Sequence, residues 1–196
     1  GASAPAYRTL SFTGTLNTGT VDIPITNAAD GYNLIPNPYP SSIDWNAASG
    51  WIKNSVNNTT YIYQHLAQQW AQFDGTTGTN NGVRYIAPGQ AFFVKANTTG
   101  NLSMTNNVRI HNGTNYLKSS NTVADNLIKI KVSGNANAIS DETVVYFANN
   151  PASSGSEKWF SYEATAPSLY TVKSNQNYAI NVISDANTTV AVPLAF

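Results

Sequence analysis

The feature of this chain that most constrains its fold is the alternation of apolar and polar side chains in short runs. Ile128, Ile130 and Val132 share one side of an extended segment, and the two lysines between them share the other. A period of two residues is that of a half-buried β-strand. The alternating runs predict these buried core positions: Leu10, Phe12, Ile128, Ile130, Val132, Val144 and Ile180.

About a dozen such runs follow one another, separated by clusters of Asn, Gly, Pro and Asp that favour turns. They lie at residues 8–12, 20–25, 59–64, 82–87, 90–96, 101–104, 107–110, 127–132, 142–148, 177–184 and 188–196. Within the second run, Pro24 indicates an edge strand, because proline has no N–H to donate. The pattern predicts an all-β fold, a jelly-roll-like antiparallel sandwich with little helix.

Two segments are candidates for structure other than a simple strand. A short turn is expected at 44–49, capped by Asp44. The stretch 64–73 fits either a short helix or a pair of strands, and its β neighbours favour a strand from Gln69 to Phe73.

The chain is predicted to be one β-sandwich module, residues 1–196, excised from a longer secreted protein. The Asn/Gly-rich segment 111–126 is the longest without a clear pattern. It is either a crossover between sheets or a boundary between two halves, and both interpretations stay open at the level of sequence.

Composition narrows the setting of the protein. Ten basic and ten acidic residues cancel, so no net field attracts nucleic acid or an anionic membrane surface. The longest apolar runs are only about four or five residues, such as 91–94, so no membrane insertion is expected. Cysteine is absent, which excludes disulfides, thiolate zinc sites and cysteine nucleophiles. With few charges and abundant Asn, Thr and Tyr, this composition predicts an exported bacterial surface protein.

The most distinctive motif is GYNLIPNPYPSSIDW at residues 31–45, followed by PGQAFFVKA at 88–96 and DETVVYFANN at 141–150. Together these segments resemble a module of large secreted proteins of the Bacteroidetes phylum, which are exported by the type IX secretion system. The resemblance covers about residues 10–196.

The sequence departs from that family's pattern at Tyr32, where tryptophan is preferred, and at Pro36, where glycine is preferred. In the family, the module usually precedes further β-sandwich domains and a C-terminal sorting domain. The resemblance therefore implies a secreted or cell-surface location, outside the outer membrane, and a β-sandwich fold. It implies no particular activity.

Motifs for catalysis and metal binding are absent from the sequence. His65 and His111 are far apart, and there is no HExxH, GxSxG or P-loop pattern. Glycoside hydrolysis needs two carboxylates about 5–10 Å apart, and adjacent acids on one strand point to opposite faces. The acids considered for such a pair are Asp44, Asp74, Asp141, Glu142, Glu157 and Glu163.

No cofactor is expected, although a structural calcium ion in the Asn-rich loops stays open. Asp30, Asp141 or Asp185 could supply its charge, but no EF-hand spacing occurs. The metal ligands are therefore left unassigned.

The aromatic residues carry the binding hypothesis. Trp45 is expected in the core, whereas alternation places Trp70 on a polar side and Trp159 opposite Phe160 and Tyr162. If Phe160 and Tyr162 face the core, Trp159 faces solvent. An exposed aromatic ring beside amides suits a sugar ring, and packing under a loop or a neighbouring domain is the alternative. The candidate ligand-binding residues are Trp70, Trp159, Trp51 (expected in a loop), Tyr61, Tyr63 and Gln72.

Three functions follow as hypotheses. The first is a non-catalytic module of an exported surface protein, serving adhesion or the binding of polysaccharide or cell-surface glycan. The second is a glycan-active hydrolase that uses two of the scattered acids. The third is a structural spacer without a ligand, whose partners are neighbouring domains of the same chain.

Overall fold

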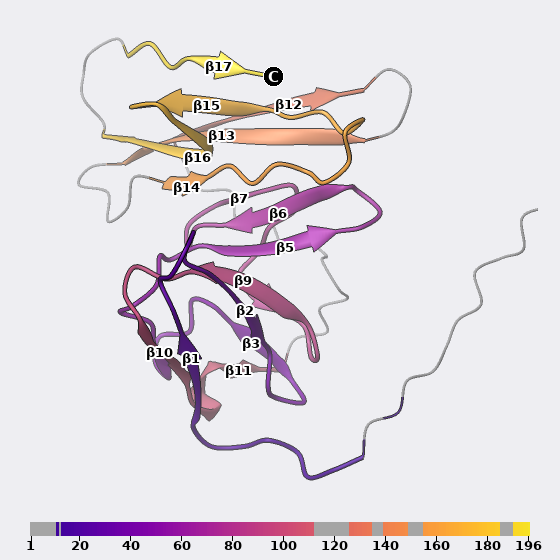
Figure 1. The fold of residues 1–196 in the computed structure, drawn as a ribbon, viewed down its shortest axis with the longest axis vertical. Helices are drawn as coiled ribbons and strands as arrows, with labels where there is room; N and C mark the ends of the chain where they lie inside the picture. The colour runs from indigo at the N-terminus through magenta and orange to yellow at the C-terminus, as the bar shows by residue number, and fades with distance from the viewer. Residues whose placement is uncertain (1–10, 12, 112–125, 135–138, 149–154, 185–189) are drawn as a thin grey trace, which may run out of the picture.

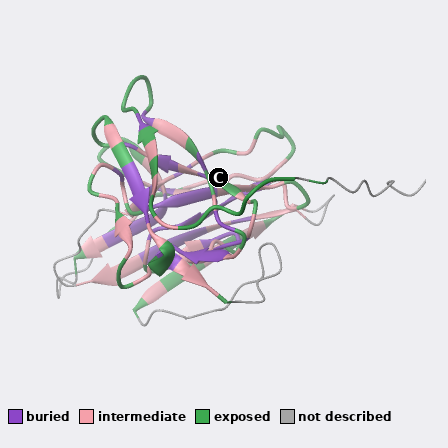
Figure 2. Ribbon diagram, turned by 90° about the horizontal axis from the view of Figure 1, so that it is seen from below, coloured by how far each residue is buried: buried purple, intermediate pink, exposed green. Residues whose placement is uncertain are grey.

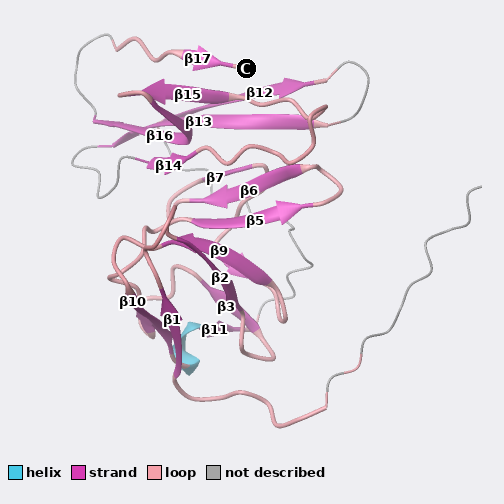
Figure 3. Ribbon diagram, in the orientation of Figure 1, coloured by secondary structure: helices cyan, strands magenta, loops and turns pink. Residues whose placement is uncertain are grey.

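The computed structural model describes residues 11, 13–111, 126–134, 139–148, 155–184 and 190–196. This part of the chain is all-β, with seventeen strands and one short 3-10 helix, η1 (Asn106–Val108) (Figure 3). The strands are β1 (Val21–Ile25), β2 (Tyr32–Pro36), β3 (Ser42–Asp44), β4 (Trp51–Ile52), β5 (Thr60–Gln64), β6 (Gln69–Phe73), β7 (Gly78–Thr79), β8 (Tyr85–Ile86), β9 (Ala91–Lys95), β10 (Gly100–Met104), β11 (Arg109–Ile110), β12 (Leu127–Ser133), β13 (Ser140–Ala148), β14 (Gly155–Glu157), β15 (Tyr170–Lys173), β16 (Gln176–Ser184) and β17 (Leu194–Ala195).

The strands form four sheets in two groups along the chain. The first eleven build three sheets, in the orders β1-β10-β4, β11-β3-β8 and β2-β9-β5-β6-β7. The last six build the fourth sheet, in the order β12-β13-β16-β15-β17, with β14 also paired to β16. Figure 1 shows the fourth sheet stacked above β5, β6 and β7. The predicted sandwich-like, all-β class is confirmed.

All described pairings are antiparallel except one. Strands β13 and β16 run parallel, with Val144 opposite Ile180, so the expectation of a purely antiparallel fold is wrong at this pair. Parallel neighbours need a crossover connection, and here it contains β14 and β15. Gly155 opens β14 with φ +118°, and a Cβ there would lie 1.9 Å from the Ile180 carbonyl oxygen.

The main hydrophobic core lies among the three sheets of the first group. Figure 2 shows the buried stretches in purple toward the middle of the molecule and exposed loops in green around them. Trp45 is fully buried, as predicted, and its ring meets those of Trp51 and Phe92 edge-on at 4.9 and 5.8 Å between centroids. The buried members are Ile25, Ile35, Tyr39, Ile43, Trp45, Val56, Phe73, Ile86, Phe92, Val94, Ala96, Leu102, Met104 and Val108.

The predicted core positions of the second group are only partly correct. Val144 and Ile180 are fully buried. Ile128, however, is 53% exposed, and Ile130 and Val132 are half-buried. The reason is that β12 is the edge strand of its sheet, paired in the described structure with β13 alone. The other two positions, Leu10 and Phe12, lie outside the described residues.

Local predictions near the first group hold. Strand β6 spans Gln69–Phe73 as expected, and Pro24 lies in the edge strand β1. Asp44 Oδ1 accepts from the Asn46 N–H at 2.9 Å, which is the capping expected for the turn after β3. The proposed division at 111–126 falls mainly outside the described residues, and no sheet formed by the described residues has strands from both sides of it.

Candidate functional site

The sheet β2-β9-β5-β6-β7 has two differently occupied faces. Along β9, Phe92 and Val94 point into the main core, so Phe93, between them, points to the other face. Residues 158–169 follow β14 and cross that second face, between the fourth sheet and strands β5 and β6 (Figure 1). The sides of β5 and β6 that the sequence predicted to face solvent are therefore covered by the later part of the chain.

Trp159 fills the centre of this second face. Its ring centroid lies 4.2 Å from that of Trp70, 4.3 Å from Tyr32, 4.9 Å from Tyr61 and 5.1 Å from Phe93. The Trp70 and Phe93 contacts are edge-to-face, a geometry that favours aromatic pairs. We call these five residues the aromatic cluster.

The predicted exposure of three candidate residues is wrong. Trp70, Tyr61 and Gln72 are 3%, 1% and 1% exposed. The alternation in β6 is as predicted, with Trp70 and Gln72 opposite Phe73, but the chain after β14 covers the side that was expected to face solvent.

Trp159 and Trp51 also differ from expectation. Trp159 is half-buried in the aromatic cluster, although alternation along 157–163 predicted solvent. Trp51 lies in β4, not in a loop, and its Nε1 donates to the Asp44 carbonyl at 2.8 Å. The structure brings Trp70, Trp159, Tyr61, Tyr63 and Gln72 together, whereas Trp51 is partly buried and packs against the main core.

Gln72 fastens the crossover to β6. With its amide oriented so that both polar atoms have partners, Gln72 donates through Nε2 to Ser156 Oγ and to the Glu157 carbonyl and accepts through Oε1 from the Trp159 N–H, each at 3.0 Å. Three hydrogen bonds to a buried amide fix the position of the backbone that carries Trp159. Gln72 thus acts on the segment 156–159 of its own chain.

An aromatic rim borders the cluster and stays accessible. Tyr162 is 72% exposed, and its ring lies 5.3 Å from that of Tyr63 and 5.5 Å from that of Trp70. Phe160 is 44% exposed and packs on Tyr170. The exposure predicted for Trp159 depended on the condition that Phe160 and Tyr162 face the core. This condition is not met, because β14 ends at Glu157 and strand alternation does not continue through them.

A buried polar triad lies beside the aromatic cluster, formed by Asn80, Asp141 and Lys158. The side chains of Asp141 and Lys158 are 0% and 1% exposed and form an ion pair, and Asn80 is 7% exposed. Asp141 Oδ1 accepts from Asn80 Nδ2 at 2.8 Å, and Oδ2 accepts from Lys158 Nζ. The Asp141 carboxylate therefore lies between the Asn80 amide and the Lys158 amine, and each of its two oxygens accepts a hydrogen bond from one of them.

Backbone groups complete the surroundings of Asp141. The N–H groups of Glu142 and Leu169 donate to it at 2.9 and 2.6 Å. Burial lowers the pKa of Lys158, and Asp141 partly offsets this effect. A buried ion pair of this kind is costly to break, because removing one partner leaves the other charge uncompensated.

Four of the other five acids considered for a hydrolase have structural partners, and the exception is Glu163, which is exposed. Asp44 holds Arg84 through two bonds of 2.7 and 2.5 Å, and Asp74 Oδ1 accepts from two backbone N–H groups of its own turn at 2.8 Å. Burial raises the pKa of Asp74. Glu157 and Glu142 pair with Lys95 and Lys129 at 2.7 and 3.4 Å.

Neither metal sites nor membrane spans are found in the described part of the chain. No group of three or more His, Asp or Glu side chains there could hold a metal ion. No helix among the same residues is long and apolar enough to cross a bilayer. Asp185, one of the three acids considered for calcium, lies outside the described residues.

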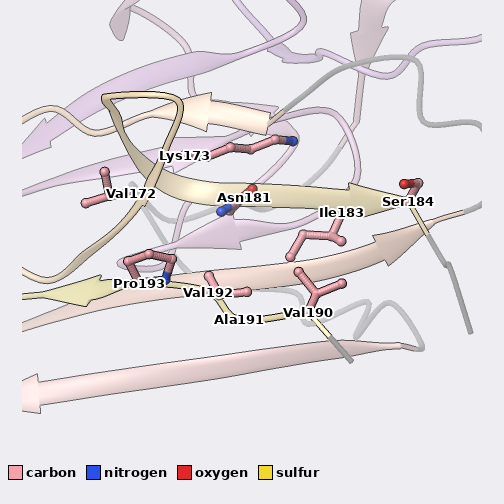
Figure 4. A pocket seen from close by; sticks show the side chains of 9 residues that line it. All are labelled: Val172, Lys173, Asn181, Ile183, Ser184, Val190, Ala191, Val192 and Pro193. Carbon is pink, nitrogen blue, oxygen red and sulfur yellow. The ribbon is translucent and has the colours of Figure 1, made fainter. Parts of the chain in front are cut away.

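A pocket of about 280 Å³ lies on the fourth sheet, between β15, β16 and residues 190–193 (Figure 4). Its walls are mainly aliphatic, with Lys173, Asn181 and Ser184 as polar members. Lys173 Nζ donates to the Val182 carbonyl at 3.1 Å. None of the predicted ligand-binding residues lines this pocket.

Sequence reasoning missed Tyr32, Phe93, Asn80 and Lys158 as members of these clusters. The sequence did contain a signal for Lys158, because alternation places it on the same side as Phe160 and Tyr162. If that side faces the core, Lys158 is buried as well. A lysine in such a pattern needs a buried acid, and Asp141 lies at the start of a motif already singled out.

One comparison identifies the family. Residues 2–196 match the family model described as "Domain of unknown function (DUF8693)", so the chain belongs to this family. No curated protein and no solved structure gives a significant match.

Proposed function

We propose that this DUF8693 domain is a non-catalytic module of an exported cell-surface protein, in which it acts as a rigid unit that carries neighbouring domains of the same chain. The observation that supports this most is the insertion of Trp159 between Tyr32, Tyr61, Trp70 and Phe93. Through Trp159, the connection between β13 and β16 packs directly against strands of the first group.

Rigidity follows from the combination of two kinds of contact. Separating the two groups of sheets would expose the aromatic cluster. It would also break the hydrogen bond from Asn80 Nδ2 to Asp141 Oδ1 and the Lys95–Glu157 ion pair. Aromatic pairs contribute about 0.5–1.5 kcal/mol each beyond their burial, and a hydrogen bond to a charged group contributes about 1.5–3 kcal/mol. Such a joint resists bending, as a spacer in a long surface protein requires.

The surface setting is supported by composition and by resemblance. The chain has no cysteine and only 10% charged residues, and its central motif resembles the Bacteroidetes modules exported by the type IX system. Labelling of intact producing cells with a membrane-impermeant reagent tests this: the full-length protein should be labelled, and protection until the cells are lysed would contradict it.

Hydrogen exchange tests the rigid-unit proposal directly. If the joint holds, amides of β5 and β6 and those of β13 and β16 exchange with the same free energy, that of global unfolding. Exchange of β13 and β16 by a separate opening of much lower free energy would refute it.

The exposed ring of Tyr162 favours a second candidate function, the binding of polysaccharide, whereas Phe160 packs on Tyr170. Tyr162 presents an exposed ring that Tyr63 and Trp70 support from below, and such preorganised rings stack on sugars. We expect Tyr162→Ala to weaken binding to a responding polysaccharide about tenfold, while the matched variant Phe160→Ala leaves it unchanged. Equal loss in both variants, or no binding to any polysaccharide tested by calorimetry, would remove this candidate.

A further inference from the structure

The buried polar triad contains the parts of a reaction that the proposed function does not use. Lys158 supplies a primary amine, Asn80 a carboxamide, and Asp141 a carboxylate that contacts both. Lys158 and Asn80 lie in segments that are 78 residues apart in the sequence (158 − 80), and both are buried.

We propose that Lys158 and Asn80 become joined by an intramolecular isopeptide bond, with Asp141 carrying the protons. The bond would connect Nζ of Lys158 to Cγ of Asn80. It would tie the crossover of the fourth sheet covalently to the loop that follows β7. The inference rests on the triad's own contacts and does not depend on the proposed function.

The step balances without an added reagent. Lys158 passes one ammonium proton to Asp141 Oδ2, and the freed Nζ lone pair attacks Asn80 Cγ. Nζ then gives up a second proton, and the Cγ–Nδ2 bond breaks as Nδ2 takes up protons through Asp141. The products are a secondary amide and one ammonium ion, which carries away the charge that Lys158 held, while Asp141 returns to the carboxylate.

The surroundings favour each part of this step. Burial lowers the pKa of Lys158, and the neutral amine is the nucleophilic form. A shared carboxylate holds the two reacting groups in place, and such fixed proximity replaces a bimolecular encounter. Asn80 is immobilised further, since its Nδ2 also donates to the Trp70 carbonyl at 3.0 Å.

The product also leaves Asp141 with partners. After the reaction, the new amide N–H can donate to Asp141 in place of the ammonium. The backbone N–H groups of Glu142 and Leu169 continue to donate to the carboxylate. The buried carboxylate is therefore not left without hydrogen bonds.

Intact mass of the purified chain is the primary test. We expect a mass below the sequence mass by one ammonia. Trypsin should fail to cut after Lys158 and should release residues 54–84 joined to residues 132–173, since Lys53, Arg84, Lys131 and Lys173 are the flanking cleavage sites. A full sequence mass together with two separate peptides would overturn the proposal.

Variants separate this bond from other reactions of the same lysine. Lys158→Arg keeps the charge but has no competent nucleophile, so it should restore the full mass, as should Asn80→Ala. Lys129→Arg, at a lysine that pairs with Glu142, is the matched control and should keep the deficit. A deficit of one water in the wild type would mean a Lys158–Asp141 bond and would refute the role of Asn80. If the variants fail to fold, as judged by circular dichroism, the wild-type peptide map alone decides.

Discussion

Replacing Trp159 with alanine tests whether the aromatic cluster joins the two groups of sheets. The substitution removes the ring that contacts Tyr32, Tyr61, Trp70 and Phe93. It leaves the Trp159 N–H, which donates to Gln72, in place. The variant therefore reports on ring packing and not on the backbone anchor.

The expected loss follows from the contacts. Truncating a buried tryptophan costs about 3–5 kcal/mol. Trp159 is half-buried, which places it near the lower end, at about 3 kcal/mol. For a chain of this size each kcal/mol corresponds to about 2–4 °C in melting temperature, so the melting temperature should fall by about 10 °C.

Urea and thermal unfolding, followed by circular dichroism, measure this loss. The matched control is Tyr162→Ala on the same segment: Tyr162 is 72% exposed, and its loss should cost less than about 1 kcal/mol. If Trp159→Ala costs no more than Tyr162→Ala, the ring does not hold the crossover and the joint is assigned to the wrong residues.

Three further predictions concern other parts of the fold. Ile130→Asp should lower the free energy of unfolding by about 2 kcal/mol without abolishing folding, because Ile130 is half-buried on an edge strand; a chain unable to fold, seen by circular dichroism, would contradict this. Gly155→Ala should destabilise the fourth sheet, because its Cβ would lie 1.9 Å from the Ile180 carbonyl oxygen; an unchanged urea midpoint would show that β14 can move away. Burial lowers the pKa of Lys53 to about 8, so between about pH 8 and pH 10.5 the unfolded chain binds more protons and stability rises with pH. The free energy of unfolding of the Lys53→Met variant should rise less across that pH window. Parallel plots of unfolding free energy against pH for the variant and the wild type would refute the lowered pKa of Lys53.

The alternation of single strands could be predicted from sequence, whereas what covers each face could not. In β6, Trp70 and Gln72 were correctly placed opposite Phe73. Whether that side meets water depends on residue 159, and the contact from Gln72 to Ser156 spans 84 positions. Alternation along one strand does not show which distant residues will cover its sides.

Residues after the end of a strand illustrate a second limit. Alternation was extended through 157–163, but β14 ends at Glu157 and the chain then crosses the second face of the first group. Phe160 and Tyr162 therefore point outward, and Lys158 and Trp159 inward. The burial of Lys158 requires Asp141 as its counter-charge, which only the fold brings near.

The crossover between β13 and β16 also has a consequence for how a nascent chain matures. Because Trp159 emerges long after Tyr61, Trp70 and Phe93, the first group of sheets spends part of synthesis with its second face uncovered. Long-range contacts of this kind form late in folding, and unfilled aromatic surface promotes aggregation. A polypeptide ending at residue 148 would retain that vulnerability permanently, so the crossover protects the preceding half of its own chain in the way that a bound partner would.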